Sequence, residues 1–341
     1  MRALFIGFGN VGRKVAEILF LERDRYPAIS LNDFSITGIF TKTKGALADM
    51  DGVNIPEALD DLREEGKFRY TNPRRTDQDI RDAILSSDYD ILVELSPLSI
   101  ESRGEPAVSY IRDALNSGKH VVSANKGPVA FAYRELKEIA RKNNRFFLHE
   151  AAVMDGAPIF NLAERTLKGC KITGLSGILN STTNFILTRM EQGETFHSAL
   201  MTAQKEGFAE ADPSHDIEGW DSAAKTAALA NVLMEAEITP FDVPREGISD
   251  VTTEMVREVI QRGKKLKLVC RARYEGDGII ARVCLEEVAS GDPFSTVHGT
   301  GSCLRIETDL MSPLIIIQHS PNLYDTAFGV IEDLETICRN G

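Results

Sequence analysis

A glycine-rich turn near the start of the chain restricts its fold more than any other stretch of the sequence. Residues 1–20 read MRALFIGFGNVGRKVAEILF, in which a short apolar run, a G-x-G-x-x-G turn and a helix-like apolar repeat follow one another. In such a pattern Gly7 permits the tight turn, Gly9 lets the backbone approach a pyrophosphate, and Gly12 lets helix and strand pack closely. The helix N-terminus would then offer N–H groups and a positive dipole end to the phosphates.

This stretch therefore predicts a dinucleotide site on the first strand of a doubly wound sheet. The alternative is a glycine turn with a purely structural purpose. The residues expected to contact the cofactor are Gly7, Phe8, Gly9, Asn10, Val11 and Gly12.

The end of the second predicted strand, residues 36–40, bears on which dinucleotide is bound. An acidic residue there would hydrogen-bond the ribose 2′-hydroxyl of NAD, but the sequence continues Thr41-Lys42-Thr43-Lys44. Asp33 precedes the strand and so falls at the wrong end. We therefore predict NADP, with Thr41 and Lys42 near the 2′-phosphate. NAD stays open as the alternative, and so do simply solvated lysines.

Strands and helices alternate through residue 149, which predicts a parallel sheet of the Rossmann type. Open sheets of this kind bind ligands outside the carboxyl ends of their strands. Ser96 follows the predicted strand 90–95, and Lys126 follows the strand 120–124 on a tight loop. A lysine there could reach a substrate carboxylate or hydroxyl, and an exposed surface lysine is the alternative. The remaining predicted elements are helices at 77–86, 106–116 and 131–142 and a strand at 145–149.

The second half of the chain has the mixed pattern of an α+β domain. We predict an N-terminal NAD(P)-binding domain of residues 1–149, completed by a C-terminal helix within about 320–341, and a catalytic and dimerisation domain of residues 150–319. The expected strands are 171–179, 305–308, 314–318 and a hairpin of 266–274 with 279–286. The expected helices are one ending at Glu191, then 195–206, 251–261 and 326–334. A run of hydroxyls and amides at 180–184 precedes the first of them, and capping of that helix by Ser181 or Thr182 is the plain alternative to a functional loop.

The densest group of charges lies in residues 207–225, GFAEADPSHDIEGWDSAAK. From Asp221 onward alanine and leucine predict a helix capped by Asp221, with Lys225 one turn further along the same face. A lysine beside a carboxylate, with Glu210 and Asp216 upstream, could bind an amine-bearing substrate and move a proton. The alternative is a solvated acidic loop with one exposed ion pair of the common, weak kind.

Composition excludes several kinds of partner. The net charge of −12 argues against nucleic acid and anionic membrane surfaces. The two basic clusters, Arg74-Arg75 and the group at 262–267, are interpreted as solvated surface. Five cysteines without a Cys-x-x-Cys pair, no leader-like start and no apolar run of about 18 residues favour reduced thiols in the cytoplasm. The six histidines have no metal-ligand spacing.

The acidic stretch also resembles a family signature. Its matching residues are Ala203, Gly207, Phe208, Ala209, Asp212, Pro213, Asp216, Ile217, Gly219, Asp221 and Lys225. At these spacings they are similar to the signature of homoserine dehydrogenases, and ANKGPVA at 124–130 resembles the lysine loop of the same family. The resemblance implies an NAD(P)-dependent enzyme that interconverts L-homoserine and L-aspartate 4-semialdehyde.

For this reaction our hypothesis couples a proton transfer to the hydride transfer and gives individual residues roles. Lys225 would be the general acid and base, with Asp221 setting its pKa. Glu210 and Asp216 would engage the substrate ammonium or hold the loop, and Lys126 would orient the hydroxyl or the cofactor. Further implied features are a substrate-facing loop at 180–184, a cofactor contact at Gly329 and a homodimer through strands of the second domain. The resemblance also implies a monovalent cation such as Na⁺ on the backbone carbonyls of Glu150, Val153, Asp155 and Ala157.

Two departures from the family keep other functions open. Residues 319–325 replace a usual glycine-rich turn, and Met154-Asp155 stand where small residues are usual. The alternatives are a dehydrogenase of another amino-acid-like alcohol and a catalytically silent NADP-binding regulatory protein. The chain is similar to the short form of the family without a C-terminal regulatory domain, so threonine feedback is not expected.

Overall fold

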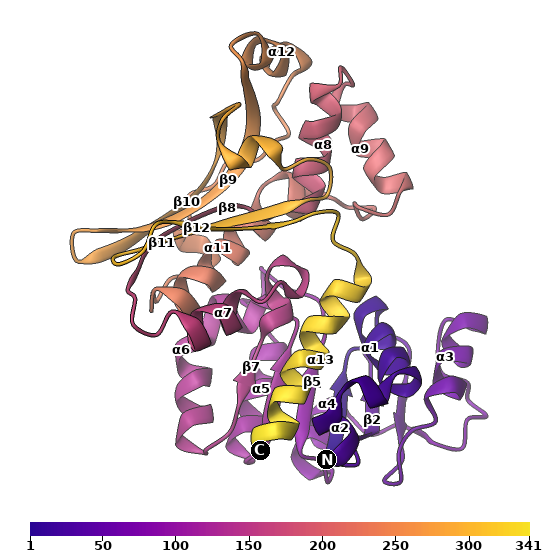
Figure 1. Ribbon diagram of the computed structural model, residues 1–341. Coiled ribbons are helices and arrows are strands. Elements are labelled where there is room, and N and C mark those ends of the chain that lie inside the picture. Colours follow the sequence, from indigo (N-terminus) through magenta and orange to yellow (C-terminus); the bar gives the residue numbers. More distant parts are fainter. The chain divides into compact units, whose positions relative to one another are not determined.

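The computed structural model covers residues 1–341, and its internal contacts divide the chain into two compact units. The first contains residues 1–159 and 322–341, and the second contains residues 160–321. Each unit is built around its own sheet, as Figure 1 shows. The predicted fold class, a Rossmann-type parallel sheet plus an α+β unit, is confirmed.

The first unit contains a seven-stranded sheet in the order β4-β3-β2-β1-β5-β6-β7. The five neighbouring strands β2, β1, β5, β6 and β7 run parallel. Strands β3 and β4 extend the edge beside β2 in antiparallel fashion. The chain leaves β1 toward β2 but later continues from β5 in the opposite direction, so the order reverses between β1 and β5. Open sheets bind ligands at such a reversal. The strands are β1 (Arg2–Ile6), β2 (Ser35–Phe40), β3 (Ala46–Ala48), β4 (Arg75–Thr76), β5 (Ile91–Glu94), β6 (His120–Ser123) and β7 (Phe147–Leu148).

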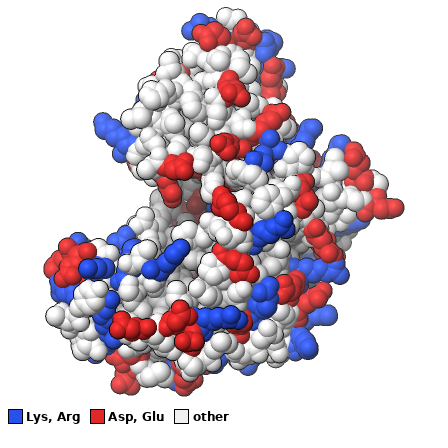
Figure 2. Space-filling view, turned by 180° about the vertical axis from the view of Figure 1, so that it is seen from behind, with Lys and Arg blue, Asp and Glu red and all other residues white.

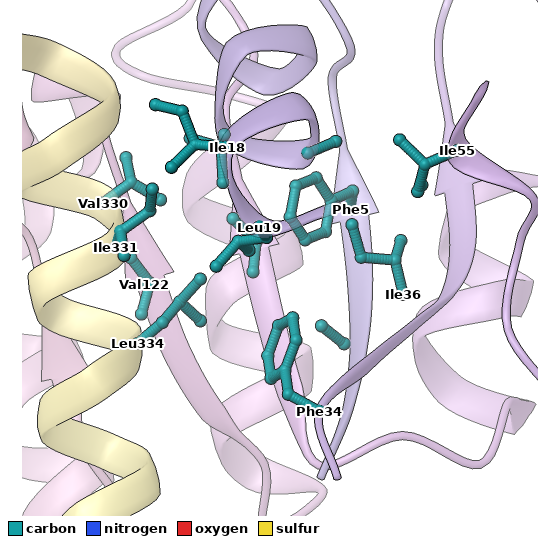
Figure 3. Close-up of a cluster of buried hydrophobic side chains, with 14 of the residues drawn as sticks. Phe5, Ile18, Leu19, Phe34, Ile36, Ile55, Val122, Val330, Ile331 and Leu334 are labelled. Atoms are coloured by element: carbon teal, nitrogen blue, oxygen red, sulfur yellow. The ribbon is translucent and has the colours of Figure 1, made fainter. Parts of the chain in front are cut away.

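Apolar side chains from the sheet and two helices form the core of this unit. Figure 3 shows Ile18 and Leu19 of α1 beside Val330 and Leu334 of α13, with Phe5 of β1 next to them. Burial of this apolar surface keeps the C-terminal helix on the first unit. The helices are α1 (Asn10–Leu21), α2 (Pro27–Leu31), α3 (Ile55–Glu64), α4 (Ile80–Ser86), α5 (Ala107–Asn116), α6 (Lys126–Lys142) and α13 (Leu323–Asn340), with a short turn η1 (Arg23–Arg25).

Two buried carboxylates on α13 accept hydrogen bonds from backbone segments that are distant in the sequence. Glu335 accepts hydrogen bonds from the backbone N–H groups of Ala28 at 3.0 Å and Ile29 at 2.9 Å. Asp333 accepts one from the N–H of Glu150 at 2.8 Å. The short turns η2 (Glu150–Ala152) and η3 (Met154–Gly156) therefore belong with the first unit, whereas the sequence placed the domain boundary at 149.

The second unit contains a five-stranded antiparallel sheet in the order β10-β9-β8-β11-β12. Helix α11 packs against β9 and β10. The strands are β8 (Ile172–Ile178), β9 (Lys264–Glu275), β10 (Gly278–Ala289), β11 (Ser302–Thr308) and β12 (Leu314–Gln318). The helices are α7 (Ile159–Thr166), α8 (Ser181–Glu191), α9 (Phe196–Lys205), α10 (Ser214–Ile217), α11 (Trp220–Leu233) and α12 (Thr253–Gln261), with short turns η4 (Pro240–Asp242) and η5 (Pro293–Thr296).

Several local predictions are corrected by the structure. Helix α11 begins at Trp220, after Gly219 in the left-handed conformation at φ 82°, so Asp221 lies in the first turn and does not cap the helix. Helix α8 is capped by Asn180, whose side chain accepts from the N–H of Thr183, and not by the two hydroxyl residues that follow Asn180. Helix α6 begins at Lys126 itself, so this lysine does not lie on a separate tight loop.

One member of the basic cluster at 262–267 is not solvated, contrary to the sequence interpretation. The side chain of Lys267 is fully buried at 0% exposure. Its Nζ donates to Asn184 Oδ1 at 3.1 Å and to Val297 O at 3.0 Å, and it lies 3.2 Å from the Glu191 carboxylate. A buried ammonium is tolerated when partners replace its water in this way.

The surface carries charges of both signs (Figure 2), and the cysteines are unpaired. On the face in Figure 2, acidic and basic side chains are interspersed and neither sign forms a continuous field. All five cysteines are free, and three of them are buried. None of the helices has the length and apolar character needed to cross a membrane.

Candidate functional site

The glycine turn between β1 and α1 has the geometry of a dinucleotide cradle. Gly7 has φ 89°, and a Cβ there would lie 2.7 Å from the Leu95 carbonyl. A Cβ on Gly12 would lie 3.0 Å from the Gly7 carbonyl oxygen. A Cβ on Gly9, in contrast, would meet no atom of the protein within 4 Å. Packing therefore explains two of the glycines, while the open space beside Gly9 fits a pyrophosphate.

The N-terminus of α1 is suited to bind an anion. Its N-cap residue is Gly9, which supplies no side-chain cap, and its first turn contains no acidic residue. Arg13, one turn further on, donates to Asn10 Oδ1 at 2.6 Å. The helix N-terminus thus combines exposed N–H groups, a positive dipole end and a nearby guanidinium, which together favour phosphate.

The end of β2 lies beside the glycine turn. Lys44 donates from Nζ to the carbonyl of Phe8 at 3.2 Å, and burial together with the charge of Arg13 lowers the pKa of Lys44. Thr41 accepts from the N–H of Lys44 at 2.8 Å and donates to the carbonyl of Gly45 at 2.7 Å. Lys42, the lysine singled out from the sequence, is exposed. Lys44 and Arg13 are thus the cations at the glycine turn. They come close to each other only in the folded chain.

A hydrogen-bonded network joins the carboxyl ends of β5 and β6. Its centre is Glu94, a fully buried carboxyl that accepts from the N–H of Ser96 at 2.8 Å and from the Ser96 hydroxyl. Ser123 donates to the same carboxyl at 3.1 Å. Burial raises the pKa of Glu94 to about 7, and these hydrogen bonds oppose the rise. Sequence reasoning missed Glu94, although one acid inside the apolar run ILVEL was a usable signal.

Lys126 begins α6 at the end of this network. The Asn125 side chain caps the helix by accepting from the N–H of Gly127 at 2.9 Å. Ser96 and Lys126 therefore follow two adjacent parallel strands, as the sequence predicted.

The predicted cation residues form the turns η2 and η3. Met154 and Asp155 both have positive φ angles, 53° and 50°. The Ala157 carbonyl already accepts from the N–H of Ile159 at 2.7 Å, although a carbonyl oxygen can accept twice. No cluster of three His, Cys, Asp or Glu side chains could hold a metal ion. A cation here would depend on the carbonyls of Glu150, Val153, Asp155 and Ala157, and this site stays a prediction.

Gly329 of α13 has a clear packing purpose. It is buried, and a Cβ there would lie 2.7 Å from the Cα of Gly156 and 3.2 Å from the Ala151 side chain. This close approach of helix and turn requires glycine whether or not a ligand is bound. The predicted cofactor contact at Gly329 stays a prediction.

The second unit holds a lysine in a mostly buried cluster. Lys225 Nζ lies 3.0 Å from Asp221 Oδ2 and donates to the Leu179 carbonyl at 2.7 Å. The side chains of Lys225 and Asp221 are only 15% and 11% exposed. The alternative of an exposed surface ion pair is therefore excluded.

Asp216 joins this cluster through Asn180 and Thr182. Asn180 Nδ2 donates to Asp216 Oδ1 at 2.7 Å and to Asp221 Oδ2 at 2.9 Å, so one amide bridges two carboxylates. Thr182 donates to Asp216 Oδ2 at 2.9 Å. Burial, and then the neighbouring Asp221 carboxylate, raise the pKa of Asp216. The cluster is thus rich in negative charge and suited to receive a further cation.

Glu210 is not part of this hydrogen-bonded cluster. Its side chain is exposed, and its carbonyl accepts from Gln204 Nε2 at 3.1 Å. His215 is also exposed. Asn180 and Thr182, which the sequence offered only within a run of hydroxyls and amides, are instead direct partners of the carboxylates.

These features define a class of protein. A doubly wound sheet with an open glycine cradle, joined to an α+β unit that carries a lysine–carboxylate cluster, is the architecture of a nicotinamide-dinucleotide-dependent dehydrogenase. The family model described as homoserine dehydrogenase matches residues 158–334. The model described as homoserine dehydrogenase, NAD binding domain, matches residues 7–150. The chain belongs to the homoserine dehydrogenase family, as the signature predicted.

Relatives and solved structures agree with this assignment. The chain is 37% identical to the homoserine dehydrogenase of Methanocaldococcus jannaschii, over 98% of this chain and 97% of that protein. It is 32% identical to the NAD(+)-dependent homoserine dehydrogenase of Pseudomonas canavaninivorans, over 96% and 94%. The crystal structure of a homoserine dehydrogenase from Thiobacillus denitrificans superposes with a TM-score of 0.81 at 28% identity, over 99% of this chain and 73% of that chain.

Proposed function

We propose that this protein interconverts L-homoserine and L-aspartate 4-semialdehyde with a nicotinamide dinucleotide. The observation that carries the proposal is the mostly buried pair of Lys225 and Asp221 in a chain of the homoserine dehydrogenase family. The nicotinamide supplies the hydride chemistry, and the protein supplies binding, orientation and proton transfer.

Lys225 is the proposed general acid and base. When the alcohol is oxidised, the hydroxyl must lose a proton, and the lysine takes it; when the aldehyde is reduced, the lysine returns it. The Asp221 carboxylate and the Leu179 carbonyl hold Nζ in one position, which a proton-transfer group requires.

The carboxylates are the proposed partners of the substrate ammonium. Asp216 and Asp221 share the Asn180 amide and repel each other, so a second cation near them is favourable. Glu210, exposed and without an ion pair, is the proposed additional contact. In the first unit, Ser96 and Lys126 are proposed to orient the nicotinamide and the substrate hydroxyl from the ends of adjacent strands.

NADP is the proposed dinucleotide, with NAD as the alternative. Lys44 and Arg13 beside the glycine turn, together with the exposed Lys42, offer positive charge to a 2′-phosphate. Residues 41–44, directly after β2, include no acid that could hydrogen-bond a free 2′-hydroxyl. One relative is named as NAD(+)-dependent, so affinity must be measured for both dinucleotides.

A homodimer formed through the sheet of the second unit is also proposed. Strand β12 pairs only with β11 and so leaves an open sheet edge. Its residue Ile315 is 38% exposed, and Leu310 and Met311 before it are 71% and 43% exposed. An open apolar edge of this kind favours pairing with a second chain. Light scattering of the purified protein tests this proposal, and a monomer at every accessible concentration would refute it.

Purified protein with L-homoserine and NADP⁺ or NAD⁺, followed by the absorbance of the reduced nicotinamide, tests the main proposal. Homoserine-dependent reduction of either dinucleotide supports it. Cofactor binding without turnover would favour a regulatory protein, and turnover only with another amino alcohol would change the substrate. The proposed compartment is the cytoplasm, because five free thiols persist in a reducing environment.

A further inference from the structure

The buried carboxyl of Glu94 is the least expected group in the first unit. It lies at the last position of β5 with 0% exposure, and no lysine, arginine or histidine forms an ion pair with it. A buried carboxyl without a cation destabilises a fold unless hydrogen bonds compensate. Its hydrogen-bond partners therefore indicate its purpose.

Those partners lie in the segment that follows β5 and at the carboxyl end of β6. One oxygen, Oε1, accepts from the Ser96 N–H at 2.8 Å and from the Ser96 hydroxyl. The other, Oε2, accepts from the Ser123 hydroxyl at 3.1 Å. The oxygen of Ser123 in turn accepts from the Asn125 N–H at 3.1 Å, and Asn125 caps α6 through Gly127.

We propose that Glu94 is a positioning residue whose carboxylate fixes Ser96 and, through Ser123 and Asn125, the start of α6 at Lys126. This inference rests on the proposed function, because it gives Glu94 a purpose within the dinucleotide and substrate site. Glu94 does not contact the reacting atoms; it acts through the two segments that are proposed to do so.

The ionised form of Glu94 is the form that fits the network. A carboxylate accepts all three hydrogen bonds from Ser96 and Ser123, whereas a protonated carboxyl must donate one, so one of these donors then loses its acceptor. Burial places the pKa of Glu94 at about 7, so the network changes within the neutral range.

Tyr110 of α5 is a titratable group that interacts electrostatically with Glu94, and Asp79, Arg81 and Glu105 act on the same phenol. On α5, Tyr110 has a pKa that is raised by burial and then by Asp79 and Glu94, so it stays neutral near pH 7. Lys126, the first residue of α6, carries a positive charge and follows Asn125 of the network. His120, the first residue of β6, and Asp90, which precedes β5, lie at the other end of these two strands.

The test compares Glu94→Leu, which removes the acceptors, with Glu94→Gln, which keeps one acceptor but cannot ionise. Affinity for NADPH is measured with the full chain by the fluorescence of the bound nicotinamide, at about pH 6 and about pH 8 to bracket the titration. Asp61→Asn is the matched control, because Asp61 is a carboxyl of the same unit at 1% exposure that accepts from Arg69 N and Asn72 Nδ2 within α3 and its following loop.

We expect Glu94→Leu to weaken NADPH binding at about pH 8 by at least about 10-fold and to lower kcat by a similar factor. The reason is that small displacements of positioned groups have large effects on binding and rate. Glu94→Gln, whose amide has one acceptor and one donor side like the protonated carboxyl, should bind NADPH at about pH 8 about as weakly as the wild type does at about pH 6. Wild-type affinity should fall from about pH 8 to about pH 6, and Glu94→Gln should show little of this change. Asp61→Asn should unfold at a lower temperature yet bind NADPH as the wild type does.

If Glu94→Leu had the NADPH affinity and the kcat of the wild type, the proposal would be overturned. A Glu94→Gln protein whose NADPH affinity depended on pH as in the wild type would overturn it too. If Glu94→Leu does not fold, the profile of Glu94→Gln decides alone. NADPH affinity does not depend on homoserine turnover, so a wild-type protein that binds NADPH without oxidising homoserine refutes the proposed function and leaves this comparison intact.

Discussion

Lys225 Nζ lies 3.0 Å from Asp221 Oδ2, one turn earlier on α11, in a pair whose side chains are 15% and 11% exposed. Exposed pairs at this spacing contribute little, but a pair shielded from water fixes the position of its ammonium group. We therefore predict that Asp221→Asn lowers kcat for homoserine by at least about 10-fold and leaves NADPH affinity unchanged.

The chain offers a matched control for this substitution. Arg134 and Glu138 form a pair at the same i,i+4 spacing, 3.3 Å apart, but their side chains are 65% and 64% exposed. Glu138→Gln should change neither kcat nor the unfolding temperature measurably. Equal effects of the two substitutions on kcat would show that the Asp221 pair has no special place in the reaction.

The charge of Asp216 predicts how homoserine binding depends on pH. Burial and the Asp221 carboxylate raise the pKa of Asp216, so this group becomes neutral at a higher pH than an ordinary aspartate. As pH falls through that raised pKa, the attraction for a substrate ammonium is lost and KM for homoserine should rise. Asp216→Asn should raise KM at neutral pH and flatten the acidic side of the profile of KM against pH. An unchanged profile would remove Asp216 from the substrate site.

Cofactor preference should depend on Lys44 more than on Lys42. The ammonium of Lys44 reaches the Phe8 carbonyl in the glycine turn, whereas Lys42 is exposed. Lys44→Ala should weaken NADP binding by about 10-fold and leave NAD binding nearly unchanged, since only NADP carries the 2′-phosphate. Lys42→Ala is the control, with a smaller loss. Titration calorimetry with both dinucleotides measures the difference, and equal losses for NADP and NAD would contradict a phosphate contact.

A substitution at Gly329 distinguishes a packing purpose of this glycine from a contact with the cofactor. A Cβ on Gly329 would lie 2.7 Å from the Cα of Gly156, so Gly329→Ala should destabilise the protein by about 1–3 kcal/mol. Gly291→Ala, at an exposed position where a Cβ meets nothing within 4 Å, should change the unfolding free energy by less than about 0.5 kcal/mol. Chemical denaturation compares the two. A stable Gly329→Ala protein with weakened NADPH binding would instead support the cofactor contact.

Much of the first unit could be predicted because its information is local. The apolar run at β1, the glycine turn and the repeat in α1 each specify their own conformation, and β5 and β6 are short apolar runs bounded by turn residues. Strands β9 and β10 extend further than predicted, 12 residues each, because polar side chains at their ends weaken the apolar pattern without preventing pairing.

The least predictable features depend on partners that are distant in the sequence. Lys267 resembles a solvated lysine until the fold brings Glu191 and Asn184 around it. The value of Asn180 as a bridge between two carboxylates likewise depends on α10 and α11 meeting the end of β8. The acidic signature identified the family and the charged residues, but burial, which turns a weak surface pair into a positioned one, is a property of the folded chain.

The most direct test of the account is the steady-state kcat for L-homoserine oxidation by wild type and Lys225→Met at saturating NADP⁺, with NADPH affinity measured in parallel. Lys205→Met, at an exposed position on α9, serves as the control. We predict homoserine-dependent formation of NADPH by the wild type and the control. For Lys225→Met we predict a loss of about 100-fold or more in kcat with NADPH affinity retained. A kcat within a few-fold of the wild type would contradict the assignment of Lys225 as the proton-transfer group.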